Sequence, residues 1–314
     1  MFREQTVRRG LGQVPILNET YNSIRVAPNI PMAKDIANEV LAAWETSSQY
    51  WNKYQALIEK MYAPLSRALI EEARIGPGQA VLDVGGGSGE PSLTIAPIVG
   101  DSGSVTFTDP AAGMVNAARA EAERRGLTNI TFHQCPAEHL SFSGDLFDAA
   151  VSRLSIMFFP DVLAGLREML RVVKPGGYVS FVVWAAREVN PFFSVVTEVL
   201  DRFVTPDVED EDAPAAFRFA RPGKLTKALK QAGAVEVTER ELAFTIEAPI
   251  NVERFWELRT EMSDTFRNKL KKLVPDQVAA IRYTVQKSVA GYFKTGGMSF
   301  PAKALVVSGK KSGD

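Results

Sequence analysis

The hydrophobic and polar positions predict an alternation of strands and helices across the middle of the chain. Apolar runs of strand length occupy residues 80–84, 104–108, 129–133, 146–154 and 178–184. Helical spacing of apolar residues predicts helices at 91–98, at 111–125 and directly after Asp161, a good helix-capping residue. Strands that are apolar nearly throughout and separated by helices indicate a parallel sheet with both faces covered. We therefore predict a doubly wound α/β fold whose ligand site lies at the carboxyl ends of the strands.

The pattern changes toward both ends of the chain. Residues 1–30 show little periodicity and predict an extended arm, whereas residues 31–57 and 62–74 predict two helices. An acidic run at 208–212 predicts a solvated loop, followed by a helix at 225–231 and strands at 235–246 and 302–308. Two helices between those strands are predicted by two apolar stripes, Phe255, Leu258, Met262, Phe266 and Leu270, then Val278, Ile281, Val285, Val289 and Tyr292. We divide the chain into an arm and helical cap (1–74), an α/β domain (75–248 with 296–311) and a helical insertion (249–295).

Composition excludes several classes of protein. Hydrophobic residues make up 46% of the 314 positions, enough to bury a sizeable core, and the net charge of −1 offers no basic surface for nucleic acid. A single cysteine permits no internal disulfide, and two histidines with that cysteine make a metal site unexpected. No apolar run is long enough for a stable membrane insertion, and the N-terminus does not resemble a secretory signal. We expect a cytoplasmic protein.

The strongest chemical signal is a cluster of glycines directly after the first strand of the predicted sheet. Residues 81–90 read Val-Leu-Asp-Val-Gly-Gly-Gly-Ser-Gly-Glu, which predicts a strand, a tight loop and the start of a helix. Glycine permits positive φ angles and close approach of a ligand, and a helix N-terminus offers free N–H groups. An ordinary turn is the alternative. A dinucleotide fingerprint would need a third glycine where Glu90 or Ser92 stands, so that motif does not fit.

Asp83 followed by glycine at positions 85, 87 and 89 resembles motif I of the class I S-adenosylmethionine-dependent methyltransferases. Residues 171–177, Arg-Val-Val-Lys-Pro-Gly-Gly, are similar to that family's Arg-Val-Leu-Lys-Pro-Gly-Gly. The resemblance covers residues 75–190 well and 216–248 and 299–309 loosely, and it is greatest to the UbiE-like small-molecule group (methyltransferase type 11). It implies S-adenosyl-L-methionine as the cofactor and a seven-stranded, mostly parallel sheet whose last, antiparallel strand is 302–308.

The resemblance also implies roles for individual residues. The glycine loop would wrap the methionine part of the cofactor, Asp109 would hold both ribose hydroxyls, and Ala137 would contact adenine through its backbone N–H. Asp109 could instead serve only as a helix cap. Pro136 replaces the family's usual Asp, which leaves Glu138 or a backbone carbonyl to bind the adenine amino group. The complete expected cofactor set is Asp83, Gly85, Gly86, Gly87, Gly89, Asp109, Pro110, Met114, Ala137, Glu138, Ser152 and Arg153.

The acceptor side is less defined by the sequence. Tyr50, Trp51 and Tyr54 lie in an aromatic segment that either walls a substrate pocket or packs on the core. Arg153 is the expected active-site residue, and it could anchor the cofactor carboxylate, bind an acidic substrate or pair with a structural carboxylate. No general base is assignable, because His133 lies within a strand pattern and His139 reads as exposed.

We therefore expect an S-adenosylmethionine-dependent methyltransferase (EC 2.1.1.-) that acts on a small, largely apolar or aromatic acceptor. The alternatives are a nicotinamide- or flavin-dependent oxidoreductase and a cofactor-binding scaffold without catalysis. A nucleic-acid substrate is disfavoured because the chain lacks both a basic surface and an Asn/Asp-Pro-Pro-aromatic motif. The sequence leaves open which atom type is methylated and whether the chain forms a homodimer.

Overall fold

A computed structural model describes residues 33–205 and 210–313. The predicted arm over residues 1–30 lies outside the described part of the chain, as do residues 208 and 209 of the predicted acidic loop. Within the described residues, no helix is long and apolar enough to cross a bilayer.

The centre of the molecule is a sheet with strand order β3-β2-β1-β4-β5-β8-β6. The first five strands of that order are parallel, and β8 runs antiparallel to both β5 and β6. The doubly wound, mostly parallel fold with an antiparallel last strand is thus confirmed, and a two-residue strand, β7, pairs with β8 in addition. The strands are β1 Ala80–Val84, β2 Ser104–Asp109, β3 Ile130–Gln134, β4 Phe147–Arg153, β5 Val173–Trp184, β6 Val235–Ala248, β7 Phe293–Lys294 and β8 Gly297–Lys310.

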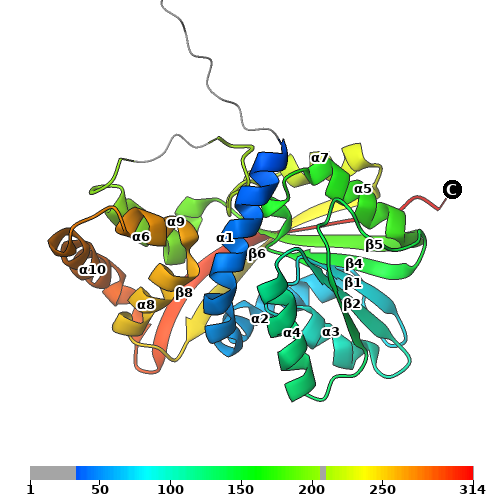
Figure 1. The fold of residues 1–314 in the computed structure, drawn as a ribbon, viewed down its shortest axis with the longest axis horizontal. Coiled ribbons are helices and arrows are strands. Elements are labelled where there is room, and N and C mark those ends of the chain that lie inside the picture. The colour runs from blue at the N-terminus through cyan, green and yellow to red at the C-terminus, as the bar shows by residue number, and fades with distance from the viewer. Residues whose placement is uncertain (1–32, 206–209, 314) are drawn as a thin grey trace, which may run out of the picture.

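Helices cover both faces of this sheet. In Figure 1, α5 and α7 lie above the strands, whereas α2, α3 and α4 lie below them. This double cover explains why β1 and β4 are buried along almost their whole length. The helices flanking the parallel strands are α2 Gln55–Glu72, α3 Ser92–Val99, α4 Ala112–Arg124, α5 Val162–Val172 and α7 Lys224–Ala232. Asp161 caps α5 as predicted, since its side chain accepts a hydrogen bond from Ala164 N.

The N-terminal helices break earlier than the sequence pattern predicts. Helix α1 spans Ala33–Lys53, and α2 begins at Gln55 instead of residue 62. The break falls at Tyr54, whose backbone leaves helical geometry and whose hydroxyl donates to Glu261 at 2.7 Å. The tertiary contact with the insertion therefore sets the boundary, which local periodicity cannot reveal.

One further expectation is corrected, and one helix is added. The sequence predicts that the Lys-Pro-Gly-Gly segment separates helix from strand, yet β5 includes it, with a register shift before Tyr178. The sequence pattern predicts no element between residues 184 and 208, but Pro191–Leu200 forms α6, with proline at the first helical position, where its missing N–H has no cost.

The insertion between β6 and β8 contains three helices instead of two. They are α8 Val252–Met262, α9 Asp264–Leu270 and α10 Pro275–Val289. Ser263 divides the first predicted stripe, because its extended backbone ends α8 and its hydroxyl caps α9 by accepting from Phe266 N. Short 3-10 turns occur at η1 Ile156–Phe158, η2 Arg187–Val189 and η3 Ala290–Tyr292.

Candidate functional site

The loop between β1 and α3 forms the floor of a cavity at the carboxyl ends of the parallel strands. Gly85 and Gly86 donate their backbone N–H groups to Thr108 O at 2.8 and 3.1 Å, which fastens the loop to β2. Neither position has room for a side chain. A Cβ on Gly85 would lie 1.9 Å from Ser155 Oγ, and one on Gly86 would lie 2.4 Å from the Phe107 ring. The loop can therefore keep this path only with glycine.

Asp83 lies one layer beneath this loop and does not line the cavity. Its Oδ2 accepts hydrogen bonds from the backbone N and the hydroxyl of Ser92 at 3.1 and 2.7 Å, which joins β1 to the start of α3. Its Oδ1 is buried and has no partner among the described residues. Burial raises the pKa of Asp83 to about 7. Asp83 thus supports the loop from below instead of touching a ligand.

The raised pKa of Asp83 predicts a pH-dependent stability. Its carboxyl deprotonates near pH 4 in the unfolded chain but only near pH 7 in the folded chain, so the folded state loses stability as pH rises between these values. Asp83→Asn should flatten this decline by about 3 kcal/mol between pH 5 and 8, because the decline spans about two pH units in that range and each unit is worth about 1.4 kcal/mol. Urea unfolding across that range measures it, with the exposed Asp101→Asn as the control. If the free energy of unfolding changed with pH in the same way for wild type and Asp83→Asn, the raised pKa would not belong to Asp83.

Asp109 stands at the end of β2 and does line the cavity. Its Oδ2 accepts from Gly87 N at 3.0 Å and its Oδ1 from Ala111 N at 2.9 Å, so it connects the glycine loop to the start of α4. Each carboxylate oxygen can still accept further hydrogen bonds. Burial raises the pKa of Asp109 to about 6. Asp109 is therefore more than a helix cap.

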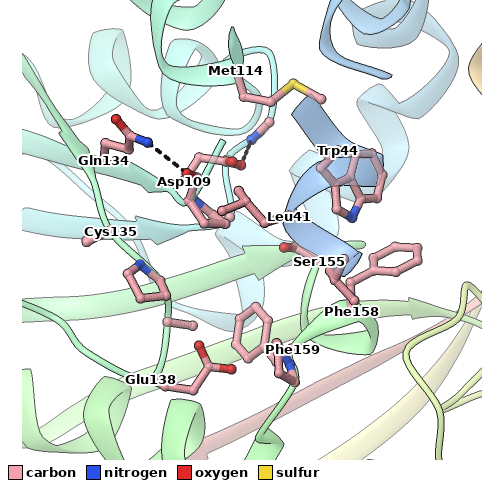
Figure 2. Close-up of a pocket in the computed structure, with 18 of the residues that line it drawn as sticks. Leu41, Trp44, Asp109, Met114, Gln134, Cys135, Glu138, Ser155, Phe158 and Phe159 are labelled. Atoms are coloured by element: carbon pink, nitrogen blue, oxygen red, sulfur yellow. Dashed lines mark hydrogen bonds between the residues drawn. The ribbon is translucent and has the colours of Figure 1, made fainter. Parts of the chain in front are cut away.

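Helix α1 closes the cavity from the side opposite the sheet. Its Glu45 accepts hydrogen bonds from Ala112 N at 2.6 Å and Gly113 N at 3.1 Å, the first free N–H groups of α4. Gly113 permits this approach, because a Cβ there would lie 2.3 Å from Ser48 Oγ. Figure 2 shows Leu41 and Trp44 of α1 on one side of the cavity and Asp109 on the other.

The cavity has a volume of about 610 Å³. Ten of the residues predicted from the sequence line it, and they are Trp51, Gly85, Gly86, Gly87, Asp109, Pro110, Met114, Ala137, Glu138 and Arg153. Five do not. Asp83 lies below the loop, Ser152 is fully buried within β4, and Gly89 packs against Leu93.

Tyr50 and Tyr54 are the other two residues that do not line the cavity. Tyr54 is bound to Glu261 of α8, and the Tyr50 ring lies 4.7 Å from the guanidinium of Arg267 in α9. Trp51 faces the cavity because it stands seven residues, two helical turns, after Trp44 and so shares its face. Tyr50, on another face of α1, and Tyr54, at the break between α1 and α2, both contact the insertion.

Apart from Trp51, sequence reasoning missed the aromatic wall of the cavity. The rings of Trp44 and Phe158 meet edge to face at 4.9 Å, and Phe159 and Leu41 also line the cavity. The two-turn spacing of Trp44 and Trp51 was a usable signal for the α1 part of this wall. The phenylalanines follow β4 at the same sheet edge as the glycine loop, but nothing local distinguishes them from core residues.

Arg153 is a buried cation whose guanidinium donates to Ser66 Oγ at 2.8 Å. It forms no ion pair with any residue in the described part of the chain, although Glu90 and Asp83 are near enough to oppose the lowering of its pKa by burial. Glu90 lines the same cavity, and its Oε1 is buried without a hydrogen-bond partner among the residues described. These two side chains offer one cationic and one anionic contact to a ligand.

Carboxylates outnumber cationic groups in the cavity. Glu90, Asp109, Glu138 and Asp161 line it, against one guanidinium, that of Arg153, among the residues that the structure describes. A net negative surface favours a ligand that carries positive charge and disfavours a dinucleotide pyrophosphate. The residues described contain no cluster of metal-ligating side chains.

Residues 81–177 match the model of a family described as a methyltransferase domain. An uncharacterized protein of Mycobacterium tuberculosis is 35% identical over 180 residues, 57% of this chain and 63% of that protein. The ubiquinone/menaquinone biosynthesis C-methyltransferase UbiE of Coxiella burnetii is 36% identical over 127 residues, 40% of this chain and 51% of that enzyme. The chain thus spans between about half and two thirds of the curated relatives it matches.

Among solved structures, the YcgJ protein of Bacillus subtilis is similar, with a TM-score of 0.52 and 19% identity, covering 78% of this chain and 98% of that one. A likeness at this identity shows a shared fold. The matched family segment contains the glycine loop, Asp109, Ala137, Glu138 and Arg153. It contains neither α1 and α2 nor the insertion, so the family match covers the glycine-loop side of the cavity and not the α1 side.

Proposed function

We propose that this chain, which contains a class I S-adenosylmethionine-dependent methyltransferase domain, transfers a methyl group to a small, largely apolar or aromatic acceptor. The aromatic wall of the cavity carries this proposal. Trp44, Trp51 and Phe158 line the cavity, and Trp44 and Phe158 lie on the side away from Asp109 (Figure 2). Such aromatic surfaces suit apolar ligands and the cationic sulfur of the cofactor.

S-adenosylmethionine supplies a methyl group activated by its positively charged sulfur. A Cβ added to Gly87 would have no protein atom within 4 Å. The glycine loop therefore leaves open space for the amino-acid part of the cofactor. Asp109 is placed to accept from the ribose hydroxyls, and its remaining lone pairs are available for them. The unpartnered oxygen of Glu90 suits the cofactor ammonium, and Arg153 suits its carboxylate.

The protein side of the reaction is positioning and exclusion of water. Holding the acceptor against the methyl group converts a two-molecule encounter into a step within one complex. Helix α1 supports that role, because Glu45 fixes it to α4 across the cavity and its apolar residues displace solvent. We propose that α6 and the insertion helices α8 to α10 complete the acceptor side.

The test uses the full chain and two binding measurements followed by turnover. Calorimetry should detect S-adenosylhomocysteine but not NAD, because the cavity carboxylates oppose a pyrophosphate. The chain is then incubated with S-adenosylmethionine and fractions of a metabolite extract separated by polarity. S-adenosylhomocysteine should accumulate with an apolar or aromatic fraction. Tight binding of NAD would favour the oxidoreductase alternative, and cofactor binding without turnover in any fraction would favour a non-catalytic scaffold.

A further inference from the structure

We propose that the outer end of the helical insertion binds reversibly to the surface of an anionic lipid bilayer. The binding surface, called the basic surface below, comprises the turn between α9 and α10 and the outward face of α10. It lies outside the segment that matches the methyltransferase family. The inference does not depend on methyl transfer, although a largely apolar acceptor would concentrate in the same bilayer.

Charge is distributed unevenly along the chain. Lysine and arginine occupy six positions of residues 265–290, and an acid occupies only one, Asp276, whereas the whole chain has 36 basic and 37 acidic residues. The net charge of −1 therefore conceals a basic segment. The negative headgroups of an anionic bilayer attract such a segment over about 10 Å at physiological salt.

Four of these six cations are available to a partner. Arg267 donates to Asp264 at 3.0 Å, and the ammonium of Lys269 lies 3.9 Å from Asp201, so both are engaged within the fold. The other four are exposed, and none of them forms an ion pair with a carboxylate in the described part of the chain. They are Lys271, Lys272, Arg282 and Lys287.

Two large apolar side chains are exposed among these cations. Val274 and Tyr283 are each 59% exposed, the highest values among the exposed large hydrophobic residues of the described chain. Val274 follows Lys271 and Lys272 in the turn before α10. The Tyr283 ring centre lies 4.6 Å from the ammonium of Lys287, one helical turn later. Such apolar parts can enter the headgroup region of a bilayer while the ammonium groups stay beside the lipid phosphates.

The outward face of α10 is accessible to a broad, flat partner. Its buried side chains point to the core, whereas Tyr283 and Lys287 share the opposite face with the small, exposed residues Ala279 and Ala280. Figure 1 shows α10 at one end of the longest axis of the molecule, away from the parallel strands. A bilayer can therefore reach the basic surface without meeting the rest of the described chain. We expect shallow adsorption, because no described helix is long and apolar enough to span a bilayer.

The apolar side chains distinguish a bilayer from a nucleic acid as the partner. The phosphates of RNA or DNA would engage the four cations, but Val274 would gain nothing, since bases stack on aromatic faces or bind through hydrogen bonds. A bilayer offers phosphates for the cations and apolar chains for both Val274 and Tyr283.

The test measures cosedimentation of the full chain with vesicles of phosphatidylcholine containing about 30% phosphatidylglycerol, and with vesicles of phosphatidylcholine alone. The anionic vesicles should bind at least about tenfold more tightly, and raising salt from about 0.1 M to about 0.5 M should remove most of this preference. Lys271→Gln with Lys272→Gln should weaken binding about 25-fold, because each cation near an anionic bilayer contributes about fivefold. Val274→Ser with Tyr283→Gln should weaken it about tenfold at both salt concentrations, because apolar burial is not screened by salt.

Lys227→Gln with Lys230→Gln is the matched control. Both lysines are exposed on α7, so this pair removes the same charge from a different face, and binding should stay within about twofold of wild type. Failure of the wild type to bind the anionic vesicles, or equal weakening by the control pair, would overturn the proposal. So would unchanged affinity of the Val274→Ser, Tyr283→Gln variant, and tighter binding of single-stranded RNA than of the vesicles would reassign the surface to nucleic acid. None of these results bears on cofactor binding, which calorimetry with S-adenosylhomocysteine measures separately.

Discussion

Gly85→Ala is expected to weaken S-adenosylhomocysteine binding by more than about a hundredfold, equivalent to roughly 3 kcal/mol. The backbone of Gly85 has φ +69°, where a Cβ costs about 1–2 kcal/mol. The new Cβ would also lie 1.9 Å from Ser155 Oγ and 2.7 Å from Ser155 Cβ. Rotation of the serine side chain relieves only the first contact, so the loop or the turn after β4 must move. The glycine loop and the turn after β4 both line the cofactor side of the cavity.

Two variants separate the steric cost from the backbone cost. Adding Ser155→Gly removes both clashing atoms, so the double variant should regain most of the lost affinity, while Ser155→Gly alone should bind nearly as wild type. Gly126 has φ +70° and no atom within 4 Å of a built Cβ, so Gly126→Ala incurs the backbone cost without the clash. It should lower stability by about 1 kcal/mol and leave binding unchanged. Wild-type affinity in Gly85→Ala would show that the loop is not part of the ligand site.

The sequence predicts those site residues that lie directly at the carboxyl end of a strand. The glycine loop and Asp109 each follow an apolar strand within a few residues, and parallel strands bring such ends to one edge of the sheet. Ala137 and Arg153 follow the same rule on β3 and β4. Their grouping in one cavity is therefore a consequence of topology, which hydrophobic periodicity reveals.

The parts that the sequence does not predict depend on contacts between distant segments. Helix α1 is amphipathic, but its position across the cavity depends on Glu45 meeting the first turn of α4, 67 residues later. The end of α1 depends on Tyr54 reaching Glu261, 207 residues away. No pattern within a window of one or two helical turns contains either partner.

Arg259 carries a signal that is visible in the sequence alone. It stands between Leu258 and Met262, on the apolar stripe that predicts α8, where a charged residue breaks the pattern. Charged residues on a buried face are costly unless they find a partner or a ligand. A break of this kind in an otherwise apolar stripe marks a residue to examine for function before its surroundings are known.

Asp109→Ala is expected to weaken S-adenosylhomocysteine binding by about 1–3 kcal/mol, roughly tenfold to a hundredfold. The carboxylate would lose its hydrogen bonds to the ribose, and Gly87 N and Ala111 N would lose the acceptor that holds the loop against α4. Asp109→Asn should also bind weakly, because its amide nitrogen must face one of these two N–H groups. Calorimetry at pH 7.5 measures all three proteins.

The pKa of Asp109, raised to about 6, adds a pH dependence of definite sign. Below pH 6 the carboxyl is protonated and loses acceptor capacity, so wild-type affinity should fall by up to tenfold for each further pH unit. The same raised pKa means that the folded chain binds this proton more tightly than the unfolded chain, so Asp109 contributes more stability at low pH than at neutral pH. Protonation of Asp109 therefore does not itself destabilise the fold, and a thermal unfolding scan at each pH separates loss of binding from unfolding. Burial also raises the pKa of Glu90 and Glu138 in the cavity, so the variant Asp109→Asn is the decisive comparison. Its affinity for S-adenosylhomocysteine should not change with pH near pH 6. A remaining change there would assign the titration to another carboxyl.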